Sequence, residues 1–435
     1  MPTRTASTAG ADLPTPLRVN RRAMLATIVL VTLVKAVLVA ALVPRPRTFE
    51  DHDVAVGFVK SGALARMHLG QLNHSIQFPV YPLAVASIYS VAGVRPPLVL
   101  AFNVLVSGVG AWLLFGLSTR WLRALDPEGH VRAGPAVLWL TVLGFLVYPP
   151  LQQYVAATVH PMAVDLTVFY LALWSGYVYL ERDEQPRDLL WLGLVAGLVL
   201  LTRTVMLVAF LPLLVTVVRR RGAGVALRRV AVVLALGLLV GVPWLVHTYA
   251  TDHIVGYTST TGEILWKGVR PGTDGSNFDD SGIAYGAAWT PEQRAWLETR
   301  TVAEQNRYFL DEYLHTVRTE PARVATMFVR KLRGFFWFRA MTGNDYGPAL
   351  RRLLPLYKLA YGAILLGALL AFWRFGGRAW EVWLPVVALG AVQAVFYVET
   401  RHRVLVEPLL LFLALATLAS VVASWRARAA QEATS

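Results

Sequence analysis

Three carboxylates stand together near the start of the chain, in the segment Phe49-Glu50-Asp51-His52-Asp53. They follow directly after the first long apolar run. Charged groups are costly close to hydrocarbon, and a carboxylate is also the group that accepts a proton from an attacking hydroxyl. Glu50, Asp51 and Asp53 are therefore either a proton-accepting site at a membrane surface or a solvated acidic loop.

A basic and aromatic segment lies late in the chain, where Arg330, Lys331 and Arg333 precede Phe335-Phe336-Trp337-Phe338. Aromatic rings and basic side chains in this arrangement are typical of a helix that lies at a membrane interface. The same cations are also suited to contact a lipid phosphate. Both interpretations place this segment beside the bilayer.

The composition sets the class of protein. Of 435 residues, 56% are hydrophobic and 16% are charged, whereas soluble domains have roughly 45–50% apolar and about 25% charged residues. The absence of cysteine excludes disulfides, thiolate metal sites and a cysteine nucleophile. The net charge of +14 comes largely from basic residues that flank apolar runs, which indicates membrane topology rather than a nucleic-acid partner. The sequence predicts an all-α polytopic membrane protein.

Ten apolar runs have lengths near those required of membrane-spanning helices. The run 189–218 is long for one span, so two short broken helices are an alternative. Residues 1–22 are expected to be a disordered cytoplasmic tail, and residues 425–435 a second cytoplasmic tail. The runs are 23–43, 80–94, 98–117, 135–149, 157–180, 189–218, 230–249, 353–373, 379–398 and 404–424.

The polar regions divide the chain further. An N-terminal transmembrane module, 23–249, contains the first outer loop, 44–79, and the C-terminal transmembrane helices occupy 353–424. Between them, 250–352 forms a large loop region that faces the same side as the acidic cluster. Its first part is rich in turn residues, and apolar periodicity predicts helices beginning near Pro291 and Pro321. We therefore expect a mixed helical extracytoplasmic region.

A metal site is one further possibility in the first outer loop. His52, His68 and His74 could hold a divalent metal together with Asp51 or Asp53, but their spacing matches no defined zinc pattern. The sequence also contains no phosphate-cradling glycine loop and no nucleophile elbow. No metal ligand or other cofactor is assigned.

The order of several short motifs resembles the GT-C glycosyltransferases, and most closely the bacterial dolichyl-phosphate-mannose-mannosyltransferase-like and aminoarabinose-transferase-like enzymes. The resemblance extends from about residue 23 to residue 424. It implies a polyprenyl-phosphate sugar donor, an acceptor on the outer side of the membrane and a carboxylate base in the first outer loop. The motifs are the acidic cluster, Phe78-Pro79-Val80-Tyr81-Pro82, Leu200-Leu201-Thr202-Arg203, Pro243-Trp244, Gly262-Glu263-Ile264-Leu265-Trp266-Lys267-Gly268 and Thr400-Arg401-His402-Arg403 with Glu407-Pro408.

The resemblance places the family's base on Asp51, with Glu50 in contact and Asp53 as the competing choice. Ala55 stands where the family has a tyrosine, and Val159-His160-Pro161 stands where an acidic residue is common. The leaving phosphate requires a positive clamp, for which the candidates are Arg401, Arg403, His402, Lys331 and Arg333. The candidates for substrate contact are Tyr81, Trp266, Lys267 and Arg203.

Several of these residues also have structural interpretations. Tyr81 is suited to the interface or the core, and Arg203 to helix packing or a lipid headgroup. A transporter or flippase for a polyprenyl-linked sugar is the competing class, although the sequence has no convincing internal repeat; a non-catalytic scaffold is a third. For a transferase, the expected location is a bacterial plasma membrane with the site outside, and the acceptor is a cell-envelope glycan, lipid or protein.

Overall fold

The computed structural model describes residues 19–434 except 128, 130–132, 183, 288 and 340–350. Helix α1 (Arg21–Leu42) begins the fold, and the Asn20 side chain caps it by accepting a hydrogen bond from the Ala23 N–H. Residues 1–18, which carry most of the predicted disordered tail, lie outside the described residues. At the other end, α19 (Glu407–Glu432) continues as one helix through the segment predicted to be the second tail.

Six helices in the described part of the chain are long and apolar enough to cross a membrane, and a seventh span results if α5 (Gly134–Val147) and α6 (Pro149–Val155), bent by 48°, count as one. The expectation of ten spans is not confirmed, because several apolar runs form shorter helices than the roughly 20 residues a span requires. Helix α3 has 13 residues (Val80–Ala92) and α8 has 17 (Pro186–Thr202). The six are α1, α4 (Pro96–Leu125), α7 (Met162–Glu181), α10 (Ala223–Asp252), the stretch Leu354–Val395 and α19.

The long apolar run 189–218 is broken, which confirms the alternative expectation of broken helices. It forms α8, the 3-10 helix η1 (Thr204–Phe210) and α9 (Leu211–Arg221). Leu354–Val395 likewise contains α16 (Leu354–Phe375), the 3-10 helix η3 (Gly376–Ala379) and α17 (Trp380–Val395). The part of the chain that the structure describes is thus mainly helical, and its only strands are four of two or three residues each.

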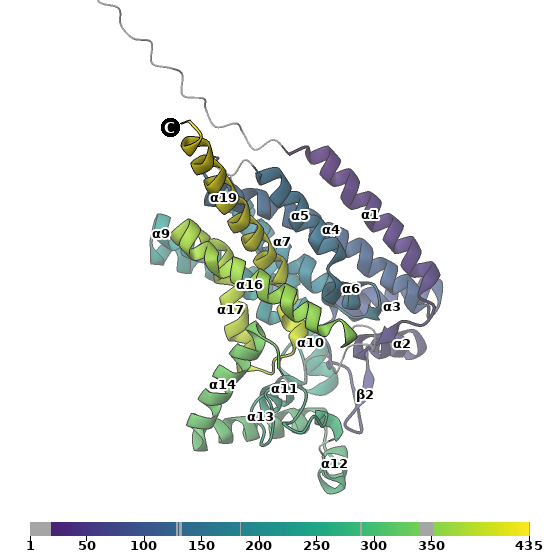
Figure 1. The fold of residues 1–435 in the computed structure, drawn as a ribbon. Helices are drawn as coiled ribbons and strands as arrows, with labels where there is room; N and C mark the ends of the chain where they lie inside the picture. Colours follow the sequence, from purple (N-terminus) through teal and green to yellow (C-terminus); the bar gives the residue numbers. More distant parts are fainter. Residues whose placement is uncertain are drawn as a thin grey trace, which may run out of the picture.

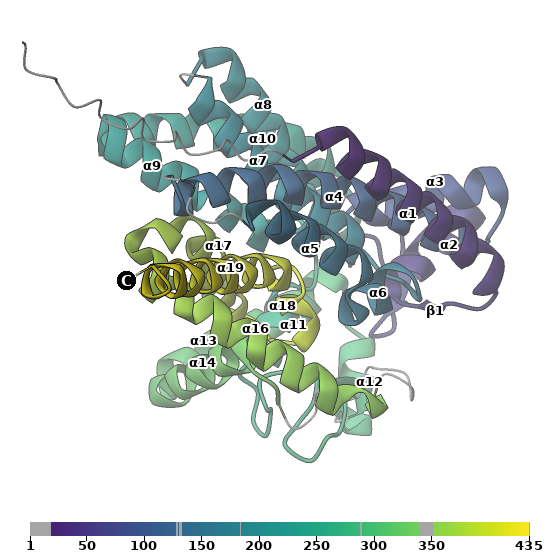
Figure 2. The same ribbon diagram turned by 45° about the horizontal axis from the view of Figure 1, so that its top comes forward.

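The helices form two packed groups (Figure 2). Helix α4 packs against α1 and α7, and α8 against α10, while α16 packs along α19. The outward faces of these helices are apolar, which is the arrangement expected of a multi-pass membrane protein in contact with lipid tails. Exposed apolar side chains on three of the helices include Leu30, Leu33, Val37, Leu227, Leu239, Val246, Leu359 and Leu366.

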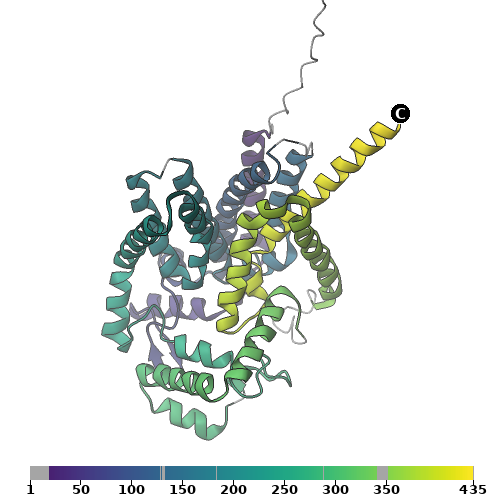
Figure 3. The same cartoon turned by 90° about the vertical axis from the view of Figure 1, so that its left-hand side faces the viewer.

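The smaller elements gather at one end of the bundle, which we call the loop end (Figures 1 and 3). Helix α2 (Glu50–Ser61) and the antiparallel strands β2 (Arg66–His68) and β3 (Gln71–Asn73) come from the first loop. The second loop region supplies α11 (Thr261–Lys267), the 3-10 helix η2 (Tyr285–Ala287), α12 (Pro291–Glu298), α13 (Val302–Thr319) and α14 (Pro321–Phe336). Helices therefore begin at Pro291 and Pro321, as the periodicity predicts.

The two loop regions are bonded to each other. The carboxylate of Asp252 accepts hydrogen bonds from the His74 backbone N–H and from the Ser75 hydroxyl at 3.0 and 2.6 Å. One ring nitrogen of His68 lies 2.8 Å from a carboxylate oxygen of Glu263. These contacts place the acidic first loop and the later basic region on the same side of the bundle.

Candidate active site at the loop end

The first turn of α2 separates the three carboxylates. Asp51 points inward and is 5% exposed, whereas Glu50 is exposed and the Asp53 side chain is 59% exposed and lies 3.6 Å from Arg66. Carboxylates are stabilised in the first turn of a helix because they face its positive end. Among the three candidates for a base, Asp51 is therefore the one that the fold turns into the protein.

A two-residue parallel pairing positions Asp51. Strand β1 (Arg47–Thr48) pairs with β4 (Thr158–Val159), so the segment that leads into α2 lies beside the segment that leads into α7. The rings of Phe49 and His160, which follow the two strands, meet edge to face at 5.5 Å. The N-termini of α2 and α7 consequently converge at the loop end of the bundle.

Helix α7 adds a carboxylate that the sequence analysis missed. Asp165, in its first turn, is buried, and one of its carboxylate oxygens lies 3.0 Å from Nε of Arg203. Arg203 sits at the break between α8 and η1, where its backbone is extended (φ −170°, ψ 109°). This break in the helix places the Arg203 guanidinium beside the start of α7.

Asp51 has the electrostatics of a group that exchanges a proton near neutral pH. Burial, with a further contribution from the carboxylates of Glu50 and Asp165, raises the pKa of its carboxyl to about 7, and the guanidinium of Arg203 opposes this shift. A buried carboxyl beside other carboxylates holds its proton more tightly because its charged form is poorly solvated. The group is thus poised near the pH at which a general base works best.

Aromatic and amide side chains complete the wall around Asp51. Tyr81, on α3, is buried, and the amide nitrogen of Asn103 donates to its hydroxyl at 3.1 Å. The Asp51 carboxylate is close enough to act on the Tyr81 hydroxyl, whose pKa lies well above its usual value, mainly through burial. The neighbouring His52 contacts Tyr89, and 2.7 Å separates its Nδ1 from the Tyr89 hydroxyl oxygen.

The positive side of the site comes from the turn α18 (Thr400–Arg403). Burial lowers the pKa of both His160 and His402 well below the usual value, and the charges of Arg401 and Arg203 lower it further. Two histidines from distant parts of the chain thus respond to the same two arginines. Both arginines therefore act on the region of His160 and His402, and Arg203 also acts on Asp51.

Arg403 occupies a different environment from Arg401. Its side chain is 0% exposed, and its Nε donates to a carboxylate oxygen of Glu407. The guanidinium lies against the ring faces of Tyr361 and Phe338, at 3.8 and 4.5 Å from their centroids. Its charge is therefore satisfied inside the protein.

Lys331, on α14, reaches the chain just before α18. Its ammonium donates to the carbonyl oxygens of Val395 and Phe396 at 3.2 and 2.7 Å, and burial together with the charge of Arg339 lowers its pKa to about 7. Arg333, two residues further along, is exposed. The phosphate ligands predicted from the sequence therefore do not form one cluster. Lys331 and Arg403 instead make contacts inside the protein that support the turn carrying Arg401.

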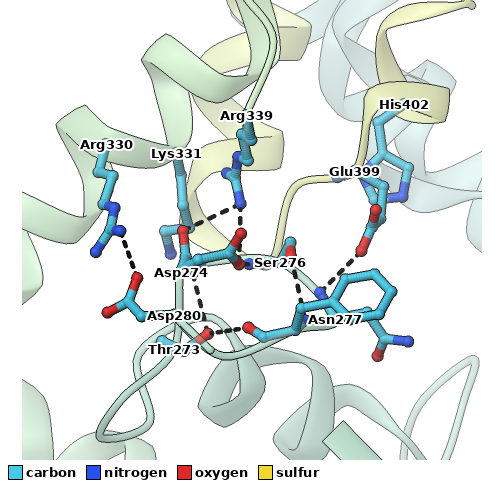
Figure 4. Close-up of polar contacts among 12 residues, drawn as sticks. Thr273, Asp274, Ser276, Asn277, Asp280, Arg330, Lys331, Arg339, Glu399 and His402 are labelled. Carbon is cyan, nitrogen blue, oxygen red and sulfur yellow. Dashed lines mark hydrogen bonds and ion pairs between the residues drawn. The ribbon is translucent and has the colours of Figure 1, made fainter. Parts of the chain in front are cut away.

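A hydrogen-bond network in the second loop region also supports the segment before α18 (Figure 4). The backbone N–H of Asn277 donates to the Glu399 carboxylate at 2.8 Å, and the Val398 N–H donates to the Gly275 carbonyl at 3.0 Å. Arg339 donates to the Asp274 carbonyl at 3.1 Å. The segment that precedes Arg401 is therefore fixed to the loop region by both backbone and side-chain bonds.

Helix α11 carries the remaining predicted contacts. Trp266 and Lys267 are half-buried, and the Lys267 ammonium lies 4.4 Å from the ring centroid of Tyr285 and 5.1 Å from that of Tyr397. The glycines that bracket the motif permit close packing, since a Cβ on Gly262 would overlap the Asn306 carbonyl and one on Gly268 the Phe396 carbonyl. The motif therefore fits α11 between α13 and the segment before α18.

The histidines considered as metal ligands are distributed over separate contacts. His52 lies against Tyr89, His68 against Glu263, and His74 against Asp252. Within the described ranges, no group of three or more histidine, aspartate or glutamate side chains is arranged to hold a metal ion.

Asp165 and His160 are the site residues that sequence reasoning missed. One clue was available, because Asp165 is a carboxylate inside an apolar run and such groups usually have a partner within the protein. The sequence has no acidic residue at Val159-His160-Pro161, and Asp165 lies further along, in the first turn of α7. His160 had no comparable clue in the sequence.

Comparisons with known proteins return two similar structures. No family model matches the chain, and no curated protein matches it. The crystal structure of ArnT from Cupriavidus metallidurans bound to undecaprenyl phosphate is similar, with a TM-score of 0.38 and 14% identity over 92% of this chain and 78% of that one. The apo-state structure of the same protein gives a TM-score of 0.35, again with 14% identity, 92% and 78%.

Proposed function

We propose that the protein is a glycosyltransferase that moves a sugar from a polyprenyl-phosphate donor to an extracytoplasmic acceptor, with Asp51 as the base. The observation that carries this proposal is the placement of Asp51, a buried carboxyl with a pKa of about 7 at the loop end of the bundle, beside a region that Arg203 and Arg401 face. A base and a cation cluster together are what transfer from a sugar phosphate requires.

The chemistry proceeds as a single displacement. The oxygen of an acceptor hydroxyl forms a bond to C1 of the sugar, and its proton passes to the Asp51 carboxylate. The bond between C1 and the phosphate oxygen breaks, and the polyprenyl phosphate leaves with the electron pair. Because the leaving group is already an anion stabilised by phosphorus, it needs positive charge more than it needs a proton.

Arg401 is the best placed residue to supply that charge. Its guanidinium is half-buried rather than enclosed, and it acts on the same region as Arg203. Arg203 has a second task, since it holds Asp165 at 3.0 Å. In this arrangement Arg403, His402 and Lys331 act as positioning residues that hold the turn on which Arg401 stands.

The test measures transfer of labelled sugar from a polyprenyl-phosphate donor pool to membrane acceptors. Asp51→Asn keeps the shape of the side chain and removes the base, so we expect the rate to fall by about 10²–10⁴-fold. Asp53→Asn is the matched control, because it makes the same change two residues away on the exposed face of α2. We expect this variant to retain wild-type activity.

Two results would contradict the proposal. Equal activity of Asp51→Asn and wild type would remove Asp51 from the chemistry while leaving the transferase class intact. A wild-type protein that transfers no sugar but moves the donor lipid across a vesicle bilayer would instead be a flippase, the class that the sequence analysis kept as its alternative.

A further inference from the structure

A cavity lies in the second loop region. Its volume is about 410 Å³, within the roughly 300–1,000 Å³ of ligand-binding pockets. Helices α11, α12 and α13 and the segment around η2 enclose it. The lining side chains are mainly aromatic and include Trp266, Tyr285, Trp289, Trp296 and Tyr308, with Arg270, Glu292 and Gln293 as the polar members.

The aromatic rings line the cavity without closing it. Tyr285 and Trp289 meet at 5.3 Å with an interplanar angle of 89°, and Trp296 and Tyr308 lie 4.8 Å apart. Trp296 is 42% exposed, and Trp266 and Trp289 are half-buried. Several ring surfaces therefore remain available to a flat or ring-shaped ligand.

A buried cation in this wall points to a ligand with hydrogen-bond acceptors. Arg270 is 7% exposed, and its Nε and Nη2 are buried without a hydrogen-bond partner. Buried donors of a charged group that lack a partner are destabilising, because they have lost their hydrogen bonds to water. An acyl chain would leave them unsatisfied, whereas a hydroxyl-rich ligand would accept both.

We propose that this cavity binds a saccharide. The C–H face of a pyranose ring is apolar and packs on an indole or phenol ring, while the hydroxyls at its edge accept from Arg270 and bond to Gln293 and Glu292. Helix α12, which forms one wall, lies at the extremity of the loop end, remote from the spans (Figure 1). That position favours a water-borne ligand over a lipid tail.

The cavity also adjoins the candidate active site, and this suggests which saccharide it binds. Tyr285 lines the cavity, Lys267 lies over the rings of both Tyr285 and Tyr397, and Tyr397 contacts the ring of His402 at 5.2 Å. One chain of side-chain contacts thus leads from the cavity to the turn that carries Arg401. Resting on the proposed function, we infer that the saccharide is part of the acceptor.

The test measures binding apart from transfer, with the full-length protein in nanodiscs. The probes are soluble hexasaccharides of glucose, mannose, arabinose and galacturonate, and uracil serves as a flat, non-saccharide probe with hydrogen-bond acceptors. We expect at least one hexasaccharide to bind, and we expect Arg270→Gln and Trp296→Ala to weaken that binding by at least about tenfold. Matched controls are Arg307→Gln on the exposed face of α13 and Trp425→Ala near the end of α19, both of which should bind as wild type.

The outcomes separate the two proposals. Failure of all four hexasaccharides to bind at millimolar concentration, equal binding by the cavity variants and wild type, or a preference for uracil would each overturn the saccharide site. Donor-lipid binding, measured with undecaprenyl phosphate on the same samples, confirms that the variants are folded. Saccharide binding with no sugar transfer would uphold the cavity while contradicting the proposed function, and wild-type transfer by both cavity variants would overturn its assignment to the acceptor.

Discussion

Two buried arginine–carboxylate pairs in this protein differ in how completely the fold encloses them. Arg403 pairs with Glu407, and the side chains are 0% and 1% exposed, with aromatic rings against the guanidinium. Arg203 pairs with Asp165, but its side chain remains 28% exposed and another acid, Asp51, stands close by. The Arg403–Glu407 pair connects α18 to α19. The Arg203–Asp165 pair lies at the edge of the candidate site, where the Arg203 side chain is partly exposed.

The difference shows why chemical type alone is a poor guide to function in a membrane protein. Arg401 and Arg403 are two residues apart and chemically identical, yet Arg401 is half-buried near Tyr397, His160 and His402, whereas Arg403 is enclosed by aromatic rings. A buried ion pair is costly to break because one charge is left behind. An arginine that is partly open can instead accept a second anion such as a phosphate.

The largest effect that separates the two pairs should be on stability. Glu407→Gln leaves the enclosed guanidinium of Arg403 without a counter-charge, and we expect a loss of about 3–5 kcal/mol. Asp165→Asn should cost much less, because water can reach Arg203. Thermal unfolding in detergent would measure both, with Asp53→Asn as the exposed control. Equal destabilisation by the two substitutions would contradict the comparison.

The next effect should be on catalysis at Arg401. Loss of one charged donor to a developing anion costs about 10²–10³-fold in rate, so Arg401→Gln should lose most sugar transfer while unfolding at the wild-type temperature. Arg401→Lys should recover part of the rate because it restores the charge but not the paired donors. Arg426→Gln, on an exposed part of α19, is the control. A wild-type rate in Arg401→Gln would remove this residue from the phosphate clamp.

A third effect should appear in the pH profile. The base must be ionised, and the pKa of Asp51 is raised to about 7. Transfer should therefore rise from about pH 6 to about pH 8, with its midpoint near 7. His160 and His402 remain neutral over this interval because their pKa values are well below the usual one. A profile without this rise, measured at saturating donor, would contradict Asp51 as the base.

The smallest effect should be a gain in stability in Asp51→Asn. The carboxyl has a pKa of about 7 in the folded protein against 3.8 unfolded, so the folded state binds the proton more tightly and loses stability as pH rises between those values. The amide removes that loss. At about pH 8 we expect a Tm a few °C above that of the wild type. A lower Tm would indicate that the Asp51 carboxylate stabilises the fold.

Much of the architecture followed from composition and periodicity, since long apolar runs can do little except form helices in a bilayer. The helices beginning at Pro291 and Pro321 were predicted in the same way, and the length of the run 189–218 suggested a break without locating it after Thr202. The number of full spans was not, because hydrophobicity does not say where a run bends or stops. Helix α3 is as apolar as a span but only 13 residues long.

The site was less accessible to sequence reasoning, because its geometry depends on pairings between distant segments. Glu50, Asp51 and Asp53 look equivalent in the sequence, and only the orientation of α2 turns Asp51 inward. Asp165 and Arg203 are brought together by the start of α7 and by the break after α8. No local sequence pattern predicts that Arg401 is half-buried whereas Arg403 is fully buried against aromatic rings.

The pairing of β1 with β4 has a consequence for biosynthesis. Asp51 is made early, but the segments around it are made later: β4, which pairs with β1, then Arg203, which acts on Asp51, and finally Arg401, near the end of the chain. Almost the entire polypeptide must therefore be made before every part of the proposed site is present. A partly made chain has the carboxylate but lacks the turn that carries Arg401.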